Sequence, residues 1–131
     1  MKISVAKREW RVAKKAGVIA ASLLVCVGVG LTAAPQGNTF TGSIMDSACA
    51  ATGSHAGMMQ SHPGIKSDKA CTLGCVKNGA KFVLYDSSTN TVYQLDDQKA
   101  PMQYAGDKVK VMGTLNADTK TIHVEKIEPG A

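Results

Sequence analysis

The sequence predicts a mainly β fold, a small five-stranded OB-like barrel that carries one inserted helix bearing cysteines. Three observations lead to this prediction. Residues 81–127 hold four short runs in which apolar and polar side chains alternate, as they do in half-buried strands. Residues 39–45 form a similar run that stands apart from these four. The segment between them is rich in Gly, Ala, Ser, His, Met and Cys and includes one helical pattern.

The first strand, residues 39–45, precedes the inserted segment, and the next two strands form a hairpin. Residues 81–85 and 91–95 alternate around a polar turn at residues 86–90. Residues 99–106 then place a proline, a methionine and a tyrosine at near-helical spacing before a glycine. This pattern predicts a short helical turn between the third and fourth strands.

Residues 108–115 and 120–127 predict a second hairpin. Gly113 permits a bulge, and the spacing of apolar residues slips between Val124 and Ile127, as a bulge would produce. His123 should face solvent because it alternates with apolar neighbours. The alternate positions of these two strands predict the barrel core: Val109, Val111, Leu115, Ile122 and Val124.

The inserted helix is expected between residues 68 and 77. Asp68 can cap its start, and Asn78 followed by Gly79 can end it. Cys71 and Cys75 are four residues apart, which places both thiols on one face of the helix, about one turn apart. Two thiols in this arrangement can interact with the same partner.

The first 34 residues have the layout of an export signal. A basic segment is followed by the apolar run 16–31 and then by small residues. These residues carry the entire formal net charge of +5, so the remainder is neutral. We expect an exported protein, periplasmic or secreted, in which residues 35–131 form a single OB-like domain with a His/Met/Cys-rich insertion at about 46–79. The apolar run is just long enough to span a bilayer, so an uncleaved N-terminal membrane anchor is the alternative.

Several motifs resemble a family of small exported bacterial proteins whose OB-like domain has no assigned function. The resemblance rests on Asp46-Ser47-x-Cys49, on the stretch CTLGCVKNGAKFVLYD and on AGDKVKVMGTL. It covers most of the chain after the export signal. The resemblance implies the fold and the membership of a site, but no reaction.

The residues that carry chemistry form one Cys/His set. Three thiolates and one imidazole are a common closed tetrahedral set for zinc, and soft thiolates also suit copper in the Cu(I) state. We therefore expect a metal site, with Asp46 positioned behind the metal-bound histidine. The expected ligands are Cys49, His55, Cys71 and Cys75, with His62 as the alternative to His55.

A disulfide is the rival prediction for the same cysteines. In an oxidising compartment, Cys49 would pair with Cys71 or with Cys75 and leave one thiol over. The closed loop would stabilise the insertion by about 3 kcal/mol. Both predictions require Cys49 to lie close to the helix cysteines.

Other classes of function find less support in the sequence. The sequence contains no phosphate loop, nucleophile elbow, His-Glu-x-x-His or Cys-x-x-Cys motif, so enzymatic activity is not expected. Nucleic-acid binding is not expected either, because residues 35–131 lack arginine, are neutral overall and contain few aromatics. We expect a binding or structural module of the cell envelope, with an envelope-ligand binder on the barrel face as a further alternative. Its partner is unknown, and contact with a membrane is expected only through an uncleaved N-terminus.

Overall fold

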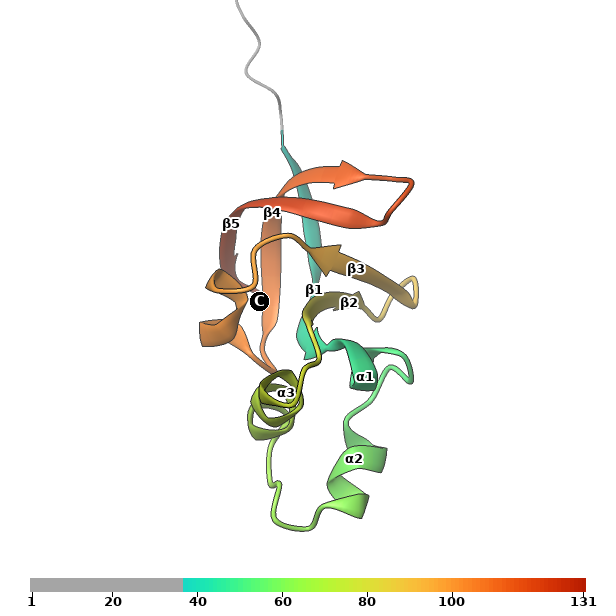
Figure 1. The fold of residues 1–131 in the computed structure, drawn as a ribbon. Helices are drawn as coiled ribbons and strands as arrows, with labels where there is room; N and C mark the ends of the chain where they lie inside the picture. Colours follow the sequence, from blue (N-terminus) through green and yellow to red (C-terminus); the bar gives the residue numbers. More distant parts are fainter. Residues whose placement is uncertain (1–36) are drawn as a thin grey trace, which may run out of the picture. The chain divides into compact units, whose positions relative to one another are not determined.

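A computed structural model describes residues 37–131, which form one five-stranded sheet. Helices α1, α2 and α3, within residues 47–77, lie at one end of this sheet (Figure 1). The predicted export signal, residues 1–34, lies outside the described residues. Within residues 37–131, no helix has the length and apolar character needed to cross a membrane. The strands are β1 (Asn38–Asp46), β2 (Phe82–Asp86), β3 (Thr91–Leu95), β4 (Lys108–Asn116) and β5 (Thr121–Pro129).

The sheet closes in a ring in the order β1-β2-β3-β5-β4. Four of the five strand pairs are antiparallel, and β1 pairs with both β2 and β4. The fifth pair, β3 with β5, is parallel and joins Gln94 to Thr121 and Leu95 to Ile122. The predicted strands are thus confirmed, and the short helical turn between the third and fourth strands is the 3-10 helix η1 (Ala100–Tyr104).

Three helices separate β1 from β2, where the sequence predicted one. They are α1 (Ser47–Ala50), α2 (Ala56–Ser61) and α3 (Asp68–Lys77). Figure 1 shows them together below the strands. α1 and α2 escaped prediction because helices of four and six residues are too short to show a 3.6-residue period.

The predicted inserted helix is α3, and its start differs in one detail. Ser67, rather than Asp68, is the N-cap, and its side chain accepts a hydrogen bond from the Ala70 N–H. Asp68 is the first helical residue, where a negative charge is favourable. At the other end Gly79 adopts a φ of +106°, as a helix stop requires.

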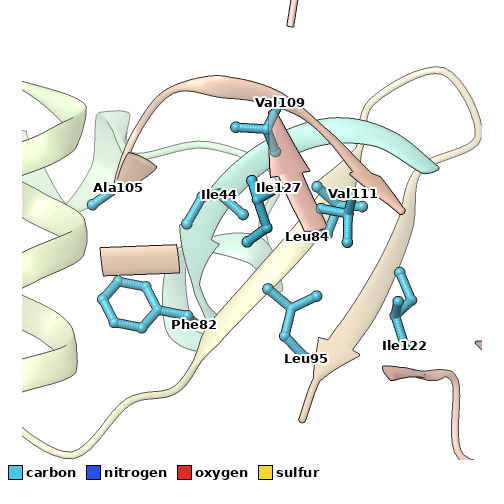
Figure 2. Packing of buried hydrophobic residues seen from close by; sticks show 9 residues of the cluster. All are labelled: Ile44, Phe82, Leu84, Leu95, Ala105, Val109, Val111, Ile122 and Ile127. Atoms are coloured by element: carbon cyan, nitrogen blue, oxygen red, sulfur yellow. The ribbon is translucent and has the colours of Figure 1, made fainter. Parts of the chain in front are cut away.

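The main core fills the interior of the ring, and Figure 2 shows its nine residues. Val109, Val111 and Ile122 are fully buried as predicted. The prediction was wrong for Leu115 and Val124, which are half-buried and pack against the edge of the core. The full set is Ile44, Phe82, Leu84, Leu95, Ala105, Val109, Val111, Ile122 and Ile127.

A bulge in the β4–β5 pair explains how Ile127 joins this core. The register shifts between Met112 and Gly113, so that Glu125 of β5 has no counterpart on β4. A side chain at Gly113 would meet the His123 carbonyl oxygen at 2.0 Å, so the close approach of the two strands requires glycine here. The predicted bulge is confirmed.

A second, smaller cluster joins the ring to the helices. Met45 of β1 and Val83 of β2 are buried against Cys49 and Ala50 of α1 and Cys71 of α3. α3 is also held to the main core through Leu73 and Val76. The cysteines therefore lie where the insertion is packed onto the strands.

Candidate metal centre

Asp46 is the last residue of β1 and is fully buried. Its Oδ1 accepts hydrogen bonds from the backbone N–H groups of Ala48 and Cys49, at 3.1 and 2.9 Å, and so caps helix α1. Its Oδ2 is also buried but has no hydrogen-bond partner in residues 37–131. A buried, unpaired carboxylate oxygen is costly, which marks this atom as one that needs a proton or a cation.

Three cysteine sulfurs lie close to the Asp46 carboxylate. Cys49 lies on α1, and Cys71 and Cys75 lie one turn apart on α3. The Sγ atoms of Cys49 and Cys71 are 3.8 Å apart. One carboxylate oxygen of Asp46 and the three sulfurs all lie within 4.8 Å of one another. The predicted proximity of Cys49 to the helix cysteines is confirmed.

The pKa values of two thiols in this cluster, Cys49 and Cys75, are raised. Burial is the main cause that raises the pKa of Cys49 above its ordinary value of 9.0, and the nearby Asp46 carboxylate adds to it. The same two causes, in the same order, raise the pKa of Cys75. A bound cation would reverse this, because its positive charge favours thiolates.

His55 does not belong to this group of four. It is buried, with its Nε2 atom 3.0 Å from the Thr72 hydroxyl and 3.8 Å from Oδ2 of Asp46. Its Nδ1 atom is 3.4 Å from the Asp68 carboxylate. The sequence placed His55 among the ligands and Asp46 behind it, whereas the structure places Asp46 in the cluster and His55 behind Asp46.

The alternative ligand, His62, is exposed and lies just after α2. It lines a cavity of about 460 Å³ together with Met58 of α2 and Cys75 of α3. His62 is therefore near the cluster's outer side without being one of its four residues.

The sequence held one signal for Asp46 that the spacing argument did not use. An aspartate directly before Ser-Ala-Cys can cap a short helix, as Asp46 caps α1. Burial of its second oxygen follows from the packing of α3, which no local pattern shows.

A separate contact between a histidine and an aspartate lies where β3 pairs with β5, and it was not predicted from the sequence. His123 is exposed, as predicted, and its Nδ1 contacts the Asp96 carboxylate. The Val124 N–H donates to Asp96 at 2.9 Å and, together with His123, holds the pKa of that carboxyl below its usual range. Asp96 thus extends the short parallel pairing of β3 with β5 and has no part in the cysteine cluster.

The three cysteines in the described part of the chain are free thiols. The donor set therefore consists of three sulfurs and one carboxylate oxygen. Such a set can hold a soft or borderline metal ion, or it can form a disulfide between the two sulfurs in contact.

Comparisons with known proteins give the chain one match. No curated protein and no solved structure matches it at a significant level. The family match covers the end of α3, including Cys75, and then β2 to β5, while Asp46, Cys49 and Cys71 lie before it. Over residues 74–130 the chain is similar to the family described as "Protein of unknown function (DUF5818)".

Proposed function

We propose that this chain is a metal-binding module that holds one soft or borderline metal ion, zinc foremost, in the cluster of Asp46, Cys49, Cys71 and Cys75. The observation that carries the proposal is the gathering of four ligand atoms within 4.8 Å, one of them from Asp46, a fully buried carboxylate whose Oδ2 has no hydrogen-bond partner among residues 37–131. A cation would supply that partner. Its positive charge would also offset the free-energy cost of burying the Asp46 carboxylate and the cysteine thiolates.

The spacing of the sulfurs supports tetrahedral zinc. Two thiolates that each lie about 2.3 Å from one tetrahedral zinc ion stand about 3.8 Å apart. The Sγ atoms of Cys49 and Cys71 are 3.8 Å apart. Their present separation therefore suits a shared ion without a change of side-chain conformation.

Neighbouring groups support the orientation of the ligands. The two N–H groups that donate to Oδ1 of Asp46 hold its carboxylate in place, and His55 lies beside Oδ2. Partners of this kind fix ligands around metals in proteins. His55 is in turn held by Thr72 and Asp68, one buried and one exposed.

Zinc and copper make different demands on Asp46. Carboxylates are regular zinc ligands, whereas Cu(I) prefers thiolates and thioethers. Zinc would use all four residues, and Cu(I) would use the three cysteines alone. Asp46→Asn should therefore weaken zinc binding and leave Cu(I) binding almost unchanged.

We place this module in the cell envelope, as an exported binding or structural protein rather than an enzyme. The support is the signal-like layout of residues 1–34 and the resemblance to small exported bacterial proteins. We further assign the five-stranded ring to the OB-like barrels, on the basis of its strand order and of the short helix between β3 and β4.

A disulfide between Cys49 and Cys71 is the second candidate, because these two sulfurs are in contact. It would make the cluster a structural staple of the insertion, with Cys75 as a free thiol. The stabilisation expected from closing this loop is about 3 kcal/mol.

Metal content and thiol titration of the same sample separate the two candidates. The full chain is purified without and with added zinc, under a mild reductant, and analysed by elemental analysis. Cys26, within the apolar run of the predicted export signal, is the matched control cysteine. One zinc per chain, lost in Cys71→Ser and kept in Cys26→Ser, supports the metal site. Absence of zinc together with a Cys49–Cys71 disulfide in an unreduced sample would overturn it in favour of the staple.

A further inference from the structure

The four proposed ligands differ in their access to solvent. Asp46 and Cys71 have no exposed surface, and Cys49 has 4%. Cys75 is only half-buried, although it shares a face of α3 with Cys71. The cluster is thus closed on the side of the ring and accessible on the side of Cys75.

Cys75 forms part of the wall of a cavity of about 460 Å³. This cavity lies among α1, α2 and α3, and its lining is mainly apolar, including Ile65. Two other side chains in its wall, Met58 and His62, carry atoms that bind soft metals. The volume is within the range of small-molecule sites and far exceeds that of a bare ion.

We propose that the metal ion enters and leaves through this cavity, with Cys75 as the ligand that exchanges and Met58 and His62 as transient ligands. The inference rests on the proposed metal site and deepens it. The site is therefore exchangeable. It takes up a soft cation from a small chelating molecule and can release the cation to such a molecule again. A closed structural site would hide all four ligands equally.

The exchange needs no redox step. During release, donor atoms of the incoming chelator replace the protein ligands in turn: the bond from the cation to the Cys75 sulfur breaks first, and the bonds to Cys49, Cys71 and Asp46 follow. Each of the three thiolates then takes up a proton from water. Loading runs the same steps in reverse, and the three protons leave the thiols for water.

Gly74 offers a way to block the cavity. It lies in the cavity wall, and a Cβ atom at this position would meet no atom within 4 Å. Gly57 on α2 has the same open surroundings but is not part of the cavity lining. Gly74→Leu and Gly57→Leu therefore make the same chemical change, one inside the exchange route and one outside it.

The test measures zinc release from the loaded full chain to the chromophoric chelator 4-(2-pyridylazo)resorcinol, alongside the equilibrium zinc affinity. We expect Gly74→Leu to slow release by about tenfold or more with little change in affinity, since a blocked route raises the barrier in both directions. Gly57→Leu should release zinc at the wild-type rate. Equal release rates in Gly74→Leu, Gly57→Leu and wild type, with normal zinc affinity, would overturn the exchange route alone.

A second variant covers the case in which Gly74→Leu fails to fold. Met58→Leu keeps the side-chain volume but removes the sulfur, and His62→Ala removes an exposed ring. The double variant should slow zinc loading and release together and leave the affinity unchanged. Unchanged rates in the double variant would contradict the role of Met58 and His62 as transient ligands. Failure of the wild-type chain to bind zinc would instead contradict the metal site itself.

Discussion

Asp46→Asn gives the most discriminating prediction, because it should act differently with and without metal. The substitution preserves the shape of the side chain and its capping oxygen, and asparagine caps helices as well as aspartate does. It replaces the other carboxylate oxygen, which has no hydrogen-bond partner among residues 37–131, with an uncharged amide nitrogen that is a poor metal ligand. In the metal-free chain, we therefore expect the free energy of unfolding to change by less than about 1 kcal/mol.

With zinc present, the same substitution should remove much of the stabilisation that the metal provides. At a free zinc concentration of about 1,000 times Kd, binding stabilises the wild-type fold by about 4.1 kcal/mol. Loss of a supporting group alone weakens metal binding by about 10–100-fold, so loss of a ligand should reach at least the upper value. The same zinc concentration then stabilises the variant by about 1.4 kcal/mol.

The difference of about 2.7 kcal/mol corresponds to roughly 10–20 °C in the zinc-induced rise of Tm for a domain of this size. Thermal melts followed by circular dichroism, with zinc and with a chelator, measure it directly. Asp68→Asn is the matched control, because Asp68 also contacts His55 but is 55% exposed and lies outside the cluster. The reasoning fails if zinc raises the Tm of Asp46→Asn as much as that of the wild type.

Three further predictions concern the core, the thiols and the N-terminus. Val111→Ala should destabilise the fold by about 1–3 kcal/mol, because the Val111 side chain is fully buried. Lys110→Ala should cost under about 0.5 kcal/mol, because Lys110 is exposed. Equal urea midpoints for the two variants would show that the two faces of β4 are wrongly assigned. Because burial and Asp46 raise the pKa of Cys49, the folded metal-free chain keeps a proton that the unfolded chain loses above about pH 9, so stability should fall as pH rises past that value. Urea titrations should show a weaker pH dependence in Cys49→Ala, and an identical one would contradict this assignment. A chain that starts at Pro35 should unfold in one cooperative thermal transition, and a non-cooperative melt of a soluble sample would contradict an independent domain.

The strands could be predicted because their information is local. Val109 and Val111 alternate with lysines, and this pattern alone assigns the two faces of β4. Gly113 likewise indicated the bulge. Leu115 and Val124 were assigned too deeply because alternation shows which face of the strand they share but not how completely that face is covered at each position.

The site could be predicted only in part. The spacing of Cys71 and Cys75 shows that they share a helix face, and the burial of Leu73 and Val76 required that helix to pack on the ring. The choice between Asp46 and a histidine depended on which side chain the packed helices enclose. That is a property of tertiary structure, and residue type alone favoured histidine, the more usual companion of three thiolates.

The position of the cluster along the chain has a consequence for how the protein folds. β1 must pair with β2 across residues 47–81, and closing so long a stretch carries an entropic cost. A cation held by Asp46 and Cys75 would tie together most of that stretch, from the end of β1 to the last turns of α3. The remaining link from Cys75 to Phe82 is short. Metal binding before the strands meet should therefore speed the pairing of β1 with β2, and the ring would assemble faster in the presence of zinc.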